Sequence, residues 1–231
     1  SLLKSNDYNL VYKKAIEYYN KGDYQRAMNL LDGVRSVFVG QAKAQNIAYY
    51  RAFCSYNMKD YQIASDLFKQ FIQTYPESSF AEECLYMMGF CDYKASPKPR
   101  LDQQVTEKAI REFQLYLSRY PYSMRKDKVN TYMDEMRDKL SYKAYLSAKN
   151  YYLREHYKAA VISLQNCLKD YPGSKYREEI MYMLFVSKYQ MAVNSVEDKK
   201  VERYNNAREE YYYFADEYPN SRYAADVKKM Y

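Results

Sequence analysis

The sequence predicts an all-α protein, a solenoid of five helical hairpins followed by a capping helix. Three observations support this fold class. Five glycines and six prolines in 231 residues are too few for the turns of an all-β protein. Apolar residues recur at helical spacing along the chain. The motif Tyr-Pro-x-Ser occurs four times, at residues 75–78, 120–123, 171–174 and 218–221.

The Tyr-Pro-x-Ser motif is expected to separate consecutive helices. Proline cannot continue a helix and disfavours helical geometry in the residue before it, while serine can cap the helix that follows. The residue twelve positions before each proline is an alanine: Ala64, Ala109, Ala160 and Ala207. A fixed spacing between a stop signal and a small residue indicates an internal repeat.

The first hairpin is predicted to begin at Tyr8, to turn at residues 21–24 and to end with a second helix. A stripe of the first helix contains Leu10, Val11 and Ala15. The stripe of the second helix runs through Ala27, Met28, Leu31, Val34 and Phe38. The second hairpin is predicted from Gln41 to Pro76, with its turn at residues 58–60.

Two insertions interrupt the later hairpins. One lengthens the third hairpin near residues 95–106 and the other lengthens the fifth near residues 193–200. Insertions in repeat arrays map to surface loops, which are often functional. Both segments are therefore expected to be exposed loops.

A long helix is predicted in the fourth repeat, as the first helix of its hairpin. Tyr132, Met136, Leu140, Ala144 and Ala148 keep i, i+4 spacing through this segment. The prediction is one helix from Met124 to Leu153, about 30 residues and roughly 45 Å long. It is expected to couple an N-terminal half, residues 1–122 with three repeats, to a C-terminal half, residues 123–231 with two repeats and the capping helix.

The hairpins resemble tetratricopeptide repeats (TPRs). The fourth copy matches the pattern best, with Ala148, Tyr151, Tyr157, Ala160, Leu164 and Pro172. The first helix of each hairpin also carries two tyrosines seven residues apart: Tyr12 and Tyr19, Tyr49 and Tyr56, Tyr86 and Tyr93, Tyr145 and Tyr152, Tyr182 and Tyr189. Rings at this spacing share a face of the helix. The resemblance implies that they face a binding groove, and ordinary packing within the repeats is the alternative.

Composition argues against several other functions. The net charge is +7, but positive and negative residues are interspersed, which favours a solvated surface over nucleic-acid binding. Cys54, Cys84, Cys91 and Cys167 have no metal-ligand spacing and are expected to be buried free thiols. The single histidine, His156, falls at a predicted turn. Without a catalytic or phosphate-binding motif, no enzymatic activity, cofactor or metal is expected.

Specific segments resemble the BamD family, the TPR lipoproteins of the outer-membrane β-barrel assembly machinery (BAM complex). They are the Tyr-Pro-x-Ser junctions, the Tyr86-Met87-Met88-Gly89 helix, the insertion with Asp102-Gln103 that leads into residues 108–113, and the long helix. The resemblance implies a lipoprotein on the periplasmic face of the outer membrane. No apolar run reaches the roughly 18 residues of a membrane span. The sequence begins at Ser1, so the lipid anchor is expected on a cysteine upstream of it.

The resemblance also implies two binding surfaces. The C-terminal half would hold the periplasmic domain of BamA, with Tyr182, Lys188 and Tyr189 as contact residues. The N-terminal half would bind C-terminal signals of unfolded outer-membrane proteins through Tyr12, Tyr19, Tyr49, Tyr56, Tyr86, Tyr93, Asp102 and Gln103. The alternative function is a periplasmic TPR adaptor with a different partner, such as a coordinator of cell-wall synthesis.

Overall fold

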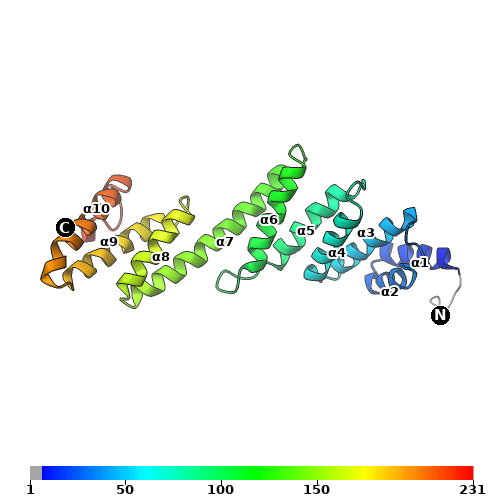
Figure 1. Ribbon diagram of the computed structural model, residues 1–231, viewed down its shortest axis with the longest axis horizontal. Coiled ribbons are helices and arrows are strands. Elements are labelled where there is room, and N and C mark those ends of the chain that lie inside the picture. The colour runs from blue at the N-terminus through cyan, green and yellow to red at the C-terminus, as the bar shows by residue number, and fades with distance from the viewer. Residues whose placement is uncertain (1–6, 231) are drawn as a thin grey trace. The chain divides into compact units, whose positions relative to one another are not determined.

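The computed structural model describes residues 7–230, and this part of the chain is all-α (Figure 1). The helices in chain order are α1 Tyr8–Asn20, α2 Tyr24–Val34, α3 Ala42–Asn57, α4 Tyr61–Thr74, α5 Ala81–Ala95, α6 Gln104–Arg119, α7 Lys126–Leu153, α8 Tyr157–Asp170, α9 Arg177–Val193, α10 Glu197–Glu217 and α11 Ala224–Met230. Consecutive helices pack on each other from α1 through α6, and again from α8 through α10. The predicted series of helical hairpins, with the long helix α7 and the capping helix α11, is confirmed.

The chain divides into two compact units, and the boundary lies inside α7, between Met136 and Arg137. In the first unit, the beginning of α7 contributes Val129 and Met133 to a core shared with α3, α4, α5 and α6. In the second unit, the end of α7 contributes Tyr145 to a core shared with α8 and α9. The division into functional halves, residues 1–122 and 123–231, concerns binding and stays a prediction.

The Tyr-Pro-x-Ser junctions have the same local structure in all four copies. The tyrosine ends its helix, and its backbone N–H donates to the carbonyl four residues earlier, as Tyr75 does to Phe71 at 2.8 Å. The serine hydroxyl accepts from the backbone N–H two residues later, as Ser174 does from Tyr176 at 3.2 Å. Proline and serine therefore end one helix and open the next, as the sequence predicts.

Three hairpin turns contain a residue with a left-handed backbone at the same place. Gly22, Lys59 and Glu155 have φ angles of 80°, 67° and 59°. The residue that follows each of them is the N-cap of the second helix of the hairpin. Asp23, one of these N-caps, accepts a hydrogen bond from the backbone N–H of Arg26 at 3.2 Å. Glycine has no Cβ to clash in this conformation, which explains its place in the first turn.

Small residues occur where the two helices of a hairpin cross. Ala15, Ala27, Ala52, Ala64, Ala109, Ala148 and Ala160 are fully buried. Gly89 occupies the position in α5 that Ala52 occupies in α3, and a Cβ at Gly89 would lie 2.9 Å from Cδ1 of Phe113. The helices can approach closely only because no larger side chain intervenes.

Several sequence predictions are wrong in detail. α2 ends at Val34, so Phe38 lies outside the helix, although it remains buried in a core formed with residues of α1, α2 and α3. Leu10 is exposed and does not belong to the buried stripe of α1. The long helix begins at Lys126 and not at Met124. The insertion in the fifth hairpin is not mainly a loop, because residues 197–200 form the first turn of α10.

The four cysteines are buried and free, as expected from the sequence. Burial raises the pKa of the Cys54 and Cys84 thiols to about 12 and that of Cys167 to about 11. At neutral pH the thiols are therefore protonated, and they behave as small core side chains.

Candidate functional site

The six tyrosines predicted to bind peptide lie on the first helix of each hairpin in the first unit. Tyr12 and Tyr19 are on α1, Tyr49 and Tyr56 on α3, and Tyr86 and Tyr93 on α5. Tyr86 is only 8% exposed, whereas the other five rings are partly exposed. Tyr86 therefore packs beneath the surface that its five counterparts reach.

Neighbouring aromatic side chains join five of these tyrosines into one series. No ring of the six contacts another of the six among the described residues; Tyr50, Phe53 and Phe90 connect them. Tyr50 lies 4.9 Å from Tyr19 and 5.4 Å from Tyr49, measured between ring centroids. The remaining centroid separations are Tyr49–Phe53 4.6 Å, Phe53–Tyr56 6.4 Å, Tyr56–Phe90 6.2 Å, Phe90–Tyr86 5.7 Å and Phe90–Tyr93 5.9 Å. We call these eight residues the aromatic series.

The connecting phenylalanines, Phe53 and Phe90, were not among the site residues predicted from the sequence. Phe53 and Phe90 each lie four residues after the first tyrosine of a pair and three before the second. That spacing places them on the same face of the helix as the pair, so it was the signal that could have found them. Tyr132 of α7 extends the series, because its ring centroid lies 4.4 Å from that of Tyr93.

Carboxylates accept hydrogen bonds from several of the tyrosine hydroxyls. Tyr49 donates to Oε2 of Glu83 at 2.9 Å, and Tyr93 donates to Glu135. Burial raises the pKa of Tyr19 and of Tyr93 to about 12, so both phenols are neutral at physiological pH. The aromatic series thus presents neutral ring surfaces, while Tyr49 and Tyr93 have their hydroxyls held by acidic partners.

Asp102 and Gln103 shape the inserted loop between α5 and α6. The buried Gln103 amide donates to the carbonyls of Lys98 and Leu101 at 2.8 and 3.1 Å and accepts from the Thr106 hydroxyl at 2.7 Å. Asp102 is exposed and accepts from the backbone N–H of Gln104 at 2.9 Å. Gln103 therefore fixes the conformation of the loop through hydrogen bonds within it. Asp102 accepts from a backbone N–H in the first turn of α6.

The predicted partner-binding residues of the second unit lie on α9. Tyr182 stacks on Tyr223 with 4.1 Å between ring centroids. Lys188 donates to Oε1 of Glu210 at 2.5 Å, which ties α9 to α10. Tyr189 and Tyr204 line a small cavity of 140 Å³. Lys188 is therefore engaged within the unit, and Tyr189 lies at the edge of a depression in its surface.

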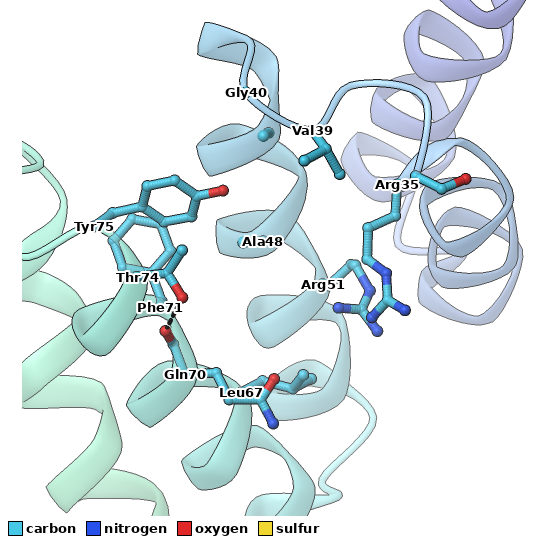
Figure 2. A pocket seen from close by; sticks show the side chains of 12 residues that line it. Arg35, Val39, Gly40, Ala48, Arg51, Leu67, Gln70, Phe71, Thr74 and Tyr75 are labelled. Carbon is cyan, nitrogen blue, oxygen red and sulfur yellow. Dashed lines mark hydrogen bonds between the residues drawn. The ribbon is translucent and has the colours of Figure 1, made fainter.

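A cavity of 410 Å³ lies between α3, α4 and the loop after α2 (Figure 2). Val39 and Gly40 contribute from the loop, Ala48 from α3, and Leu67 and Phe71 from α4. Gly40 has a φ angle of 78°, which suits glycine at this bend.

Two arginines also line this cavity (Figure 2). Arg51 is tied to Asp32 by a 2.6 Å hydrogen bond from its Nε. Arg35 is exposed and forms no ion pair among the described residues.

An equivalent cavity of 370 Å³ lies one repeat further, between α4 and α6 and over α5; we call it the α4–α6 groove. Ala64 and Ala109 are equivalent positions, so Glu112 of this groove corresponds to Leu67 of the first cavity. The two cavities are therefore related by the repeat but differ in chemistry, because an acidic side chain replaces an apolar one.

A buried polar cluster adjoins the α4–α6 groove. Nζ of Lys108 lies 2.8 Å from Oδ2 of Asp92 and 3.7 Å from Oε1 of Glu112. Ser65 donates to Oδ2 of Asp92 at 2.9 Å. Oε2 of Glu112 is buried, and no N–H or O–H group of residues 7–230 donates to it. Burial, together with the neighbouring Asp92 carboxylate, raises the pKa of Glu112 to about 8.

Two further properties of residues 7–230 concern metal ions and membranes. No group of three or more His, Cys, Asp or Glu side chains in this range could hold a metal ion. None of the helices described here has both the length and the apolar character needed to cross a bilayer.

Comparison with known proteins gives one family and a larger set of solved structures, which includes the two that follow. No curated protein matches the chain. The TPR2AB domain of yeast Sti1, in its pHSP90 complex, aligns over 97% of this chain and 96% of its own, with 11% identity and a TM-score of 0.44. A TPR repeats protein from Bacteroides fragilis NCTC 9343 aligns over 98% and 96%, with 12% identity and a TM-score of 0.45. The fold assignment rests on the helix packing described above and not on these alignments.

The profile of the YfiO family, described as an outer membrane lipoprotein, matches residues 4–179 and, in a second alignment, residues 144–231. The two alignments overlap and together cover nearly the whole chain. The sequence segments that resemble BamD and the packing of the helical hairpins agree with this match. The chain therefore belongs to the YfiO (BamD) family of outer membrane lipoproteins.

Proposed function

We propose that this protein is a non-enzymatic scaffold of the outer-membrane protein assembly machinery, held by a lipid anchor at the periplasmic face of the outer membrane. The observation that carries the proposal is the family match over nearly the whole chain. In this proposal the N-terminal half binds C-terminal signals of unfolded outer-membrane proteins, and the C-terminal half binds the periplasmic domain of BamA.

The aromatic series supports a peptide-binding role for the first unit. Signals of this kind alternate aromatic and apolar residues, and ring faces such as Tyr19, Tyr56 and Tyr93 can contact them edge to face. Such a contact contributes about 0.5 to 1.5 kcal/mol beyond burial. Tyr86 would act from beneath by supporting Phe90, and Gln103 by fixing the loop that carries Asp102.

Exposed apolar residues on α10 support a protein-binding role for the second unit. Val201, Tyr204, Tyr212 and Tyr213 are all exposed. Tyr204 also contacts Tyr189 of α9, with ring centroids 6.0 Å apart. Val201 and Tyr204 lie three residues apart, on one face of α10, and adjacent exposed apolar side chains of this kind are typical of protein interfaces. In this proposal Tyr182 and Tyr189 belong to the BamA surface, and Lys188 keeps α9 and α10 together beneath it.

Recovery of BamA tests the C-terminal surface. The lipid-anchored full-length protein should capture BamA from a solubilised envelope extract, and Tyr189→Ala combined with Tyr204→Ala should lower recovery by about tenfold. Tyrosines at interface centres often contribute at least the 1.4 kcal/mol that corresponds to tenfold. Tyr8→Ala, which changes an exposed tyrosine of α1, is the matched control. A wild-type protein that recovers no BamA would contradict the proposal.

Peptide affinity tests the N-terminal surface. Tyr19→Leu, Tyr56→Leu and Tyr93→Leu together should weaken binding of an N-acetylated peptide with the C-terminal sequence of an outer-membrane protein by at least about tenfold. Leucine keeps the apolar bulk but removes the ring faces. Fluorescence anisotropy measures the affinity, and circular dichroism confirms helicity at the assay temperature. Unchanged affinity in the folded variant would exclude the aromatic series from binding.

A further inference from the structure

The α4–α6 groove has apolar walls and an apolar floor. Ile72 of α4 and Leu115 of α6 line its two sides, and Leu85 and Met88 of α5 lie between them. Leu85 and Met88 are buried, whereas Leu115 is more than half exposed. A cavity of 370 Å³ is within the range of small-ligand sites and can accept one or two large apolar side chains.

Positive charge surrounds this apolar surface. Lys69 of α4 and Arg111 of α6 line the groove and are exposed. In the described part of the chain Lys69 forms no ion pair, and Arg111 has only a 4.0 Å contact with the exposed Glu107. The third cation, Lys108, is already balanced by Asp92. The groove can therefore pair two cations with an anionic ligand group, and arginine suits a carboxylate especially well.

Glu112 adds a buried carboxyl group to the lining of the groove. The residue is 8% exposed and lines the groove, and its pKa of about 8 means that the carboxyl carries a proton at neutral pH. That proton can be shared with the neighbouring Asp92 carboxylate, and the carbonyl oxygen of Glu112 can then accept a hydrogen bond from a ligand N–H.

The fold itself does not require this buried carboxyl. In the second repeat, Leu67 is equivalent to Glu112, and Ser55 is equivalent to Asp92. In the fifth repeat, Glu210 is equivalent to Glu112, and Lys188 is equivalent to Asp92. The side chains of Lys188 and Glu210 pair directly at 2.5 Å. Among the second, third and fifth repeats, only the third has acidic residues, Asp92 and Glu112, at both positions. They lie next to the groove that Lys69 and Arg111 line.

We propose that the α4–α6 groove binds the C-terminal residue of a peptide. The apolar side chain of that residue packs on Leu85 and Met88, its carboxylate pairs with Lys69 and Arg111, and its amide N–H donates to Glu112. One C-terminal residue carries all three groups within a few bonds of one another, whereas a fatty acid offers no N–H donor. This inference rests on the proposed function, because it assigns the last residue of the signal peptide to a site apart from the aromatic series.

The free carboxylate is the first feature to test. The probe is an N-acetylated peptide that alternates aromatic and apolar residues and ends in phenylalanine, used with a free carboxylate and with a C-terminal amide. The full chain should bind the free acid about tenfold more tightly than the amide, the scale of one charge-assisted pairing. Lys69→Gln with Arg111→Gln should abolish this preference. Lys13→Gln with Arg35→Gln, which also removes two exposed cations from the first unit, should keep it.

Glu112→Leu separates a binding role from a structural one. The substitution copies Leu67 of the preceding repeat and leaves the pairing of Lys108 with Asp92 in place. It should melt no lower than wild type and should bind the free-acid peptide about tenfold more weakly. A residue with a purely structural role would show the reverse, a lower melting temperature with unchanged affinity in the folded protein.

The outcomes distinguish this inference from the proposed function. Equal affinity for the acid and the amide, or a preference that survives in the Lys69 and Arg111 variant, would overturn the groove assignment. In that case peptide binding that still depends on Tyr19, Tyr56 and Tyr93 would leave the proposed function standing. Failure of wild-type protein to bind either peptide would overturn both.

Discussion

Ala160→Arg is expected to unfold the core of the second unit. Ala160 is 0% exposed and packs among Tyr145, Ala148 and Leu164, where α8 meets α7. An arginine there overfills a packed site, at about 1 to 3 kcal/mol, and buries a charge at a further cost of several kcal/mol. Together these costs approach the roughly 5 to 15 kcal/mol that stabilise a whole domain.

Hydrogen exchange followed by mass spectrometry can locate this effect. Amides of α8 and α9 should lose protection in Ala160→Arg, while those of α3 and α4 in the first unit should keep it. Gln165→Arg places the same side chain at an exposed position of α8 and is the matched control. Wild-type protection of α8 in the Ala160 variant would show that the alanine does not lie at a close helix contact.

Gly89→Ala is expected to destabilise the first unit, although alanine favours a helix. A Cβ at this position would lie 2.9 Å from Cδ1 and 3.0 Å from Cε1 of Phe113, and that ring is fully buried. Overpacking costs about 1 to 3 kcal/mol, against a gain of at most about 1 kcal/mol in helix propensity. The expected net loss is on the order of 1 to 2 kcal/mol in the free energy of unfolding.

A double-mutant cycle can assign this loss to the Phe113 ring. Chemical denaturation should show that Gly89→Ala costs less when Phe113 is already leucine, because the clashing ring atoms are gone. Gly173→Ala, where a Cβ meets nothing within 4 Å, serves as the control and should change stability little. An equal cost of Gly89→Ala in both backgrounds would mean that the helix contact is not the cause.

The sequence alone determined where most helices end and which residues repeat. Proline, serine and glycine act through neighbouring backbone atoms, so the junction at residues 171–174 and the turn at Gly22 were predictable without any partner helix. The seven-residue spacing of the tyrosines likewise follows from helix geometry. The insertion at residues 193–200 was the exception: its length was evident, but its addition to α10 depends on packing against α9.

Only the tertiary structure decided what the candidate site residues contact. Lys108 and Glu112 have the spacing of an ordinary surface pair on one helix, and packing against Asp92 of α5 buries the carboxyl. Gln103 turns into its own loop and does not face outward. These contacts join residues from different helices or across a loop, and they depend on how the helices are rotated against each other. Helical periodicity shows which residues share a face, but the rotation is set by the close fit of small residues such as Gly89 against the neighbouring helix.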